Sequence, residues 1–105
     1  MKRAERERMG RRAEMLAAWF LRCKGWRILG RRIRNPRGEV DLIARRGRIV
    51  AFVEVKWRQR ADLLDDAIDV YRLRRVAEAA GAMAHKYVRQ GDDMRIDVLL
   101  LAPGR

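Results

Sequence analysis

Residues 38–57 of the chain read GEVDLIARRGRIVAFVEVKW. Two β-rich runs, residues 39–44 and 49–57, flank a turn signal, so the stretch predicts a β-hairpin. Glycine at the first central position favours a two-residue turn at Gly47-Arg48. Strand residues whose numbers sum to 95 then pair, which places Asp41 opposite Glu54. A turn at Arg46-Gly47 would also keep both acids on one face, whereas a three-residue loop would separate them.

Charged side chains interrupt both predicted strands. Because strand side chains alternate between faces, Glu39 and Asp41 share one face of the first strand, and Glu54 and Lys56 share one face of the second. Facing carboxylates repel, and a buried ion is costly unless another charge compensates it. Lys56 supplies one positive charge for Asp41 and Glu54 together. We therefore expect either a divalent cation, for which oxygen ligands favour Mg²⁺, or pairing of the acids with arginines on an exposed sheet face.

The first alternative predicts a reaction. A cation held by Asp41 and Glu54 would polarise a phosphate oxygen and lower the pKa of a bound water. Lys56 would orient that water or offset negative charge on the phosphorus. The expected chemistry is metal-assisted hydrolysis of a phosphodiester.

Residues 4–23 predict a helix, with an apolar stripe of Met9, Ala13, Leu16, Ala17 and Phe20. Glu14 departs from the pattern, because its lateral neighbours on the helix are small or apolar. We expect its carboxylate to point inward or into a cleft; the alternative is a pair with Arg11 or Arg22 at the edge of the stripe. Trp19 is expected in the core, and Gly25 is expected to end the helix.

The rest of the chain supplies the other elements of the fold. We expect a short strand around Trp26 and Ile28, a basic loop over residues 30–38, and a helix from Asp62, its N-cap, to about Tyr87. A turn at 90–93 precedes a last strand, MRIDVLLLA, whose nearly continuous apolar residues predict cover on both faces. The order α-β-β-β-α-β predicts an α/β fold, a mixed β-sheet flanked by two long helices.

Composition points to a polyanionic partner. The 105 residues suit a single domain, and 26 Lys and Arg against 14 Asp and Glu leave a net charge of +12. Nucleic acid is the commonest partner of such a surface, and arginine makes forked contacts to phosphate; an arginine-rich, solvated surface is the alternative. The arginines expected to hold the nucleic acid are Arg31, Arg32, Arg34, Arg37, Arg58 and Arg72.

Location follows from what the sequence lacks. No apolar run approaches the length of a membrane span, and the basic N-terminus has no apolar core of a secretory signal. The single cysteine excludes an internal disulfide and fits a reducing compartment. We expect a cytoplasmic protein that has no membrane partner.

Several motifs resemble a known family. Asp41 followed by Glu54-Val55-Lys56 on a hairpin resembles the PD-(D/E)xK nuclease superfamily. GEVDLI (residues 38–43) and FVEVK (residues 52–56) are specific blocks of the uncharacterised, YraN-like bacterial family, which the chain resembles over nearly its whole length. Gly10, Glu14, Gly25-Trp26 and Ile96-Asp97-Val98 also match. That family is similar in its core to archaeal Holliday-junction resolvases.

The resemblance implies roles for individual residues. It implies a restriction-endonuclease-like fold in which Glu14 is the helix-borne acid near the metal. Asp41 and Glu54 would be metal ligands, with the Val55 carbonyl as a third, and Lys56 the catalytic lysine. Glu39 would have a supporting role.

The function implied is that of a Mg²⁺-dependent DNA endonuclease that can also use Mn²⁺ and acts on branched or otherwise structured DNA. DNA is expected rather than RNA, and a homodimer is compatible with the resemblance. The alternative is a nucleic-acid-binding module that uses the same fold without cleaving. Two positions depart from the family pattern: Ala13 stands where glycine is usual, and Arg72 where lysine is usual. Arginine keeps the charge but cannot transfer a proton.

Overall fold

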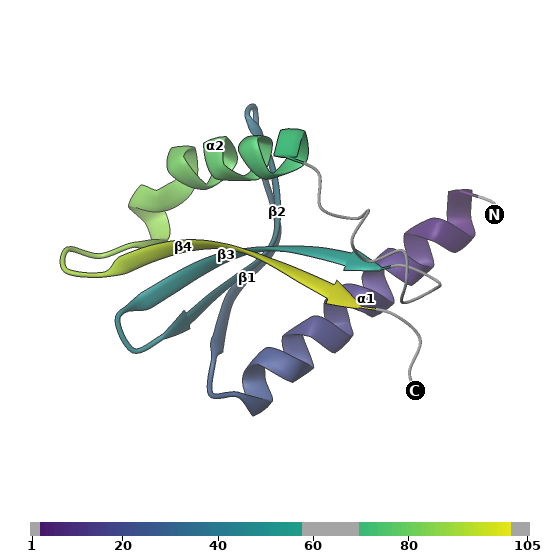
Figure 1. The fold of residues 1–105 in the computed structure, drawn as a ribbon, viewed down its shortest axis with the longest axis horizontal. Coiled ribbons are helices and arrows are strands. Elements are labelled where there is room, and N and C mark those ends of the chain that lie inside the picture. Colours follow the sequence, from purple (N-terminus) through teal and green to yellow (C-terminus); the bar gives the residue numbers. More distant parts are fainter. Residues whose placement is uncertain (1–2, 58–69, 102–105) are drawn as a thin grey trace.

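The computed structural model describes residues 3–57 and 70–101, with side chains from Gly10 onward. The elements in chain order are α1 (Arg3–Cys23), β1 (Arg27–Asn35), β2 (Gly38–Arg46), β3 (Ile49–Trp57), α2 (Val70–Tyr87) and β4 (Asp93–Leu101). The strands form one sheet in the order β1-β2-β3-β4, antiparallel from β1 to β3 and parallel between β3 and β4. The helices cover opposite faces of this sheet (Figure 1). This mixed α/β arrangement confirms the predicted class and is compatible with a restriction-endonuclease-like core.

The β2–β3 hairpin has the predicted register. Its pairs run from Arg46↔Ile49 to Leu42↔Val53, so their numbers sum to 95. Gly47 has a φ of 62°, a left-handed conformation that favours glycine at this turn position.

The hairpin opens beyond Leu42 and Val53. From there β2 stays paired with β1 as far as Gly38, while β3 stays paired with β4 as far as Trp57. The two strands therefore part where Asp41 and Glu54 stand. We call this opening, between residues 38–41 and 54–57, the strand fork.

The face of the sheet under α2 holds the larger core. α2 buries positions three or four residues apart, as an amphipathic helix should, and Phe52 meets Tyr87 edge to face with ring centroids 6.5 Å apart. The fully buried members are Val40, Ile43, Val50, Phe52, Val76, Ala79, Ala80 and Met83. This packing fixes α2 beside the strand fork.

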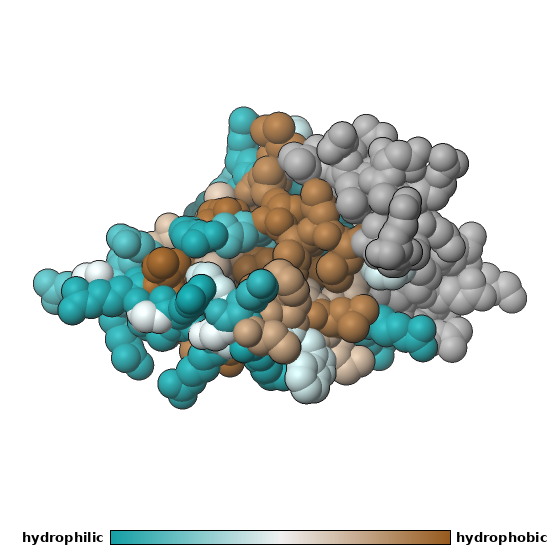
Figure 2. Space-filling view, turned by 60° about the horizontal axis from the view of Figure 1, so that its bottom comes forward, coloured by the Kyte–Doolittle hydropathy of each residue, from teal (hydrophilic) through white to brown (hydrophobic). Residues whose placement is uncertain are grey.

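The other face is covered by the small residues of α1. Ala17 and Ala18 pack on Leu42, Ala51 and Val53. Four large apolar residues of the helix lie on its outer side, namely Met15, Leu16, Trp19 and Phe20, whereas Leu21 packs against the core. Figure 2, turned toward the α1 side, shows apolar surface on this face.

Two sequence predictions for α1 are therefore wrong. Trp19, expected in the core, is 61% exposed, and Leu16 and Phe20 are about half exposed although both were expected in the buried stripe. The reason is steric: alanine lets the helix backbone approach the sheet closely, so the helix turns its alanines inward. The end of α1 was predicted correctly. Gly25, at φ 91°, donates its N–H to Arg22 O, and Trp26 N–H donates to Leu21 O at 2.9 Å.

Two further predictions need correction. Residues 30–38 are not a basic loop, because β1 continues to Asn35 and only a tight turn precedes β2. Asn35 shapes this turn: its side chain accepts from Arg37 N–H and donates to Ala79 O. β4 is covered only in part: residues 93–95 are exposed and residues 96–101 half-buried, with Ile96 packed against the core under α2 and Leu99 and Leu101 against the core under α1. It lies at the edge of the sheet.

The start predicted for the second helix, at Asp62, lies outside the described residues. Within them, no helix is long and apolar enough to cross a membrane.

Candidate active site

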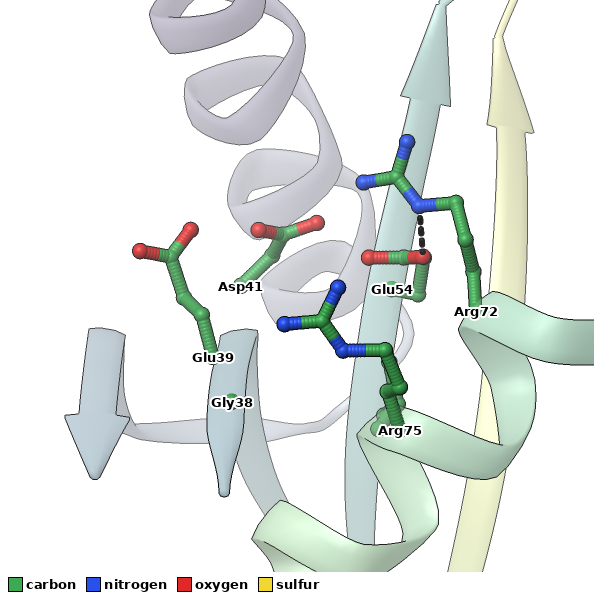
Figure 3. Close-up of a pocket in the computed structure, with 7 residues that line it drawn as sticks. Gly38, Glu39, Asp41, Glu54, Arg72 and Arg75 are labelled. Carbon is green, nitrogen blue, oxygen red and sulfur yellow. Dashed lines mark ion pairs between the residues drawn. The ribbon is translucent and has the colours of Figure 1, made fainter. Parts of the chain in front are cut away.

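A cavity of about 130 Å³ opens at the strand fork. β2 and β3 form two of its walls and α2 forms the third (Figure 3). Three carboxylates and two guanidinium groups meet around it: the lining residues are Gly38, Glu39, Asp41, Glu54, Arg72, Arg75 and Val76. The predicted hairpin acids therefore do come together.

Asp41 stands at the point where the strands part. Its Oδ2 accepts a hydrogen bond from Val55 N–H at 2.8 Å, across the fork. Burial raises the pKa of Asp41 to about 7 against the lowering effect of that hydrogen bond, and the charges of Glu54, Glu14 and Glu39 raise it further. Among the described residues no cationic side chain forms an ion pair with Asp41, so the charged form of its carboxyl group is poorly compensated.

Glu54 and Lys56 are the buried charges of β3, only 5% and 7% exposed. Lys56 Nζ lies 3.7 Å from Glu54 Oε2. Arg72 reaches the same oxygen from α2, with its Nε at 3.3 Å. Glu54 is therefore shared between a lysine of its own strand and an arginine of the helix above it, the pair drawn in Figure 3.

Glu14 confirms the prediction that its carboxylate points inward or into a cleft. Its side chain is 17% exposed, and its Oε1 lies 2.6 Å from Arg32 Nε. The partner is therefore an arginine of β1, not Arg11 or Arg22 on its own helix. The hydrogen bond to Glu14 raises the pKa of Arg32, and the negative charges of Glu39 and Asp41 raise it further.

Glu39 forms the most exposed pair of the site. It accepts a hydrogen bond from Arg34 Nε on the neighbouring strand and also lines the cavity. Glu14, Glu39 and Glu54, which with Asp41 we call the acid cluster, thus each have an arginine partner. The sequence offers pairing with arginines on an exposed sheet face as an alternative to a metal ion, but Glu54 is buried where it meets its arginine.

The donor set fits a small hard cation with few protein ligands. Among the described residues no group of three or more His, Cys, Asp or Glu side chains could hold a metal ion. Mg²⁺ usually takes one or two carboxylates and keeps several waters. Asp41 and Glu54, with the Val55 carbonyl, match that requirement, and a nearby cation would stabilise the charged form of Asp41, whose pKa is raised by burial first and by neighbouring acids second.

The predicted nucleic-acid-binding arginines separate into groups. Arg31, Arg34 and Arg37 are exposed on the β1–β2 hairpin, whereas Arg32 belongs to the acid cluster. Arg72 lines the cavity, and Arg58 lies outside the described residues.

Arg75 was missed among the predicted site residues. It lines the cavity because it stands three residues after Arg72 on the same side of α2. That spacing was visible in the sequence and could have identified it.

Comparison with known proteins places the chain in a family. Residues 13–101 match the model of the uncharacterised protein family UPF0102. A UPF0102 protein of Sphingopyxis alaskensis is 66% identical over all of this chain and 90% of its own length. One of Erythrobacter litoralis is 62% identical over 99% of this chain and 90% of its own length. One of Caulobacter vibrioides is 42% identical over 93% of this chain and 79% of its own length. The chain therefore belongs to the uncharacterised protein family UPF0102, the YraN family that its hairpin blocks resemble.

Proposed function

We propose that this protein is a metal-dependent nuclease that hydrolyses phosphodiester bonds in DNA. The observation that carries the proposal is Asp41, a half-buried carboxylate at the strand fork that forms no ion pair with a described residue and lies near three other acids. A protein that only held nucleic acid would gain nothing from such a group, because it repels phosphate.

The cluster supplies a role for each residue. A divalent ion would provide charge stabilisation and an activated water at this site. Asp41 and Glu54 would hold it, with the Val55 carbonyl as a further ligand. Lys56, buried beside Glu54, would stabilise negative charge on the phosphate being cleaved.

The rim of the cavity would bind the nucleic acid backbone. Arg72 and Arg75 project from α2 over the acids (Figure 3), and Arg31, Arg34 and Arg37 are exposed on the neighbouring hairpin. Guanidinium groups bind phosphate oxygens in pairs. The similarity of the family to archaeal Holliday-junction resolvases favours DNA over RNA and branched DNA over linear duplexes. It also favours Mg²⁺, with Mn²⁺ as a substitute, and a cytoplasmic enzyme that could act as a homodimer.

A second function has its own supporting observation. Glu14, Glu39 and Glu54 each pair with an arginine, which neutralises most of the cluster without metal. This arrangement would suit a nucleic-acid-binding module that retains the nuclease fold without cleaving.

The test compares wild type, Glu54→Gln and Glu78→Gln on linear, flapped and four-way-junction DNA with Mg²⁺, Mn²⁺ or EDTA. Glu78 is the matched control, an exposed glutamate of α2 outside the cavity. A nuclease cleaves only with metal, loses cleavage in Glu54→Gln and keeps it in Glu78→Gln. Tight binding by all three proteins without cleavage under any condition would establish the binding module instead.

A further inference from the structure

Arg32 has an unusual backbone conformation. Its φ is 49°, and it is the one non-glycine residue with positive φ among those the structure describes. L-residues other than Asn and Asp avoid this region, and strain of this kind persists only where surrounding contacts enforce it. Such conformations concentrate at ligand-binding sites. The contacts of Arg32 should therefore explain why its backbone keeps a positive φ.

Arg32 lies beside the acid that defines the fork. In the β1–β2 register Arg31 pairs with Leu42 and Ile33 with Val40, which puts Arg32 across from Asp41. Glu14 approaches from α1 and takes the Nε hydrogen at 2.6 Å. Glu14 of α1 therefore holds the guanidinium group of Arg32, and the β1–β2 register places Arg32 across from the proposed metal ligand.

The bond to Glu14 uses only one side of the guanidinium. Apart from Glu14, Arg32 makes no hydrogen bond or ion pair with another described residue. Its side chain is 42% exposed while that of Glu14 is 17% exposed, and the bond to Glu14 uses Nε, so the two terminal nitrogens have no partner among the described residues. Two parallel N–H donors held in this way match two oxygens of a phosphate.

We propose that Arg32 contacts the phosphate bound beside Asp41. In this proposal Glu14 is not a metal ligand but a positioning residue, which orients Arg32. The proposal rests on the proposed function in one respect, that a phosphate of the nucleic acid lies at the fork. It separates Arg32 from the exposed arginines of the same hairpin, which would bind other phosphates through charge alone. It also assigns Glu14 a role different from the one that the family resemblance implies.

Binding in EDTA tests the contact without cleavage. We would measure fluorescence anisotropy of labelled four-way-junction DNA with wild type, Arg32→Lys, Glu14→Gln and Glu14→Ala. Arg32→Lys keeps the positive charge but loses the paired N–H donors of the guanidinium group. The affinity for DNA should therefore fall roughly tenfold, while the slope of log affinity against log salt stays unchanged. The affinity of Glu14→Ala should fall by the same factor. Glu14→Gln should retain most of the affinity, because its amide oxygen can still accept a hydrogen bond from Arg32 Nε.

Two comparisons control this experiment. Arg95→Lys changes an arginine that is similarly paired, with Asp97 at 2.9 Å, on β4 outside the cavity, and it should bind like wild type. The double variant Glu14→Ala/Arg32→Lys should be no weaker than either single variant, because the two residues act as one unit. Wild-type affinity in Arg32→Lys would overturn the proposal, even if Glu14→Ala failed to fold.

Metal binding tests the role of Glu14 separately. Mn²⁺ affinity would be measured by electron paramagnetic resonance in the absence of DNA. The charge-neutral double variant Glu14→Gln/Arg32→Gln should bind Mn²⁺ within about twofold of wild type, while Asp41→Asn should lose most of the affinity. Equal losses in both variants would make Glu14 a metal ligand and overturn its positioning role. If the wild type binds no Mn²⁺, the proposed metal-dependent nuclease activity is wrong. The DNA affinity of Arg32→Lys in EDTA then tests the phosphate contact independently of that activity.

Discussion

Asp41 is the residue at which burial and charge conflict most directly. Its carboxylate is half-buried and lies near three other acids, which raise its pKa to about 7 against the lowering effect of one backbone hydrogen bond. Glu54, with Lys56 and Arg72 beside it, has the compensation that Asp41 lacks. The same chemical group on two neighbouring strands therefore has two different environments.

The raised pKa of Asp41 predicts how stability depends on pH in the metal-free protein. The folded-state pKa of about 7 exceeds the ordinary value of 3.8, so between these values the folded chain holds a proton that the unfolded chain has released. The free energy of unfolding should thus fall as pH rises through this window, by at most about 1.4 kcal/mol per pH unit. Urea denaturation in EDTA from pH 5 to 8 measures this slope. Asp41→Asn should flatten it, and an identical slope in that variant would contradict the assignment.

The left-handed conformation of Arg32 predicts a separation of stability from binding. Arg32→Asn removes a partly exposed ion pair worth at most about 1 kcal/mol but introduces a residue that tolerates positive φ. Its free energy of unfolding should lie within about 1 kcal/mol of wild type, while DNA affinity falls. Arg32→Val loses the same pair and adds a β-branched side chain, so it should be less stable than Arg32→Asn by about 1–2 kcal/mol. Equal stability of the two variants in urea denaturation would show that the backbone strain is negligible.

At the scale of the elements, an ion pair joins parts of the chain at the end of the sheet opposite the fork. Arg45 near the end of β2 binds Asp92, with Nη2 2.5 Å from Oδ2, and also donates to Tyr87 O. Asp92 in turn accepts from Arg89 N–H. These bonds connect β2 to the segment between α2 and β4, and the bond from Arg45 holds the pKa of Asp92 below its usual value.

This ion pair predicts a pH-dependent loss of stability in Asp92→Asn. Because the folded-state pKa of Asp92 is lowered, its contribution is present above the ordinary value of 3.8 and disappears as pH falls toward the folded-state pKa. Thermal unfolding should show a lower Tm for Asp92→Asn than for wild type at pH 7, and the difference should shrink below about pH 4. Asp93→Asn, at an exposed neighbouring aspartate, is the control and should leave Tm unchanged.

At the scale of the whole molecule, the two sides of the sheet differ in character. The α2 side carries the fork, its acids and the arginines at the cavity rim (Figure 3). The α1 side exposes large apolar residues, among them Trp19 and Phe20, and apolar surface is visible on this face in Figure 2. With a net charge of +12 spread over the chain, nucleic acid binding on the α2 side should be dominated by phosphate contacts.

Binding should therefore weaken steeply with salt. Removal of one phosphate contact should reduce the slope of log affinity against log salt by about one unit. Arg37→Ala, at an exposed hairpin position, should do so and should weaken binding to all DNA sequences alike. A titration of labelled DNA from low to physiological salt measures both effects. An affinity that does not change over this range would contradict the electrostatic argument.

Local chemistry explains which predictions from the sequence succeeded. Gly47 determines the hairpin turn, the turn determines the register, and the register brings Asp41 and Glu54 to the same fork. Glu14 could be placed because helical spacing surrounds it with small residues, and Gly25 because a left-handed residue suits the end of a helix. All of these depend on neighbours close in sequence.

The sequence by itself therefore determined the order of the elements, the hairpin register and the acids that face the cavity. Only the tertiary structure decided that α1 turns its alanines and not Trp19 toward the sheet, and that β4 lies at an exposed edge. It also decided that Arg32 pairs with Glu14. The physical reason is that periodicity and turn chemistry act along the chain, whereas helix–sheet distance and the choice of ion-pair partner depend on surfaces that meet only after folding.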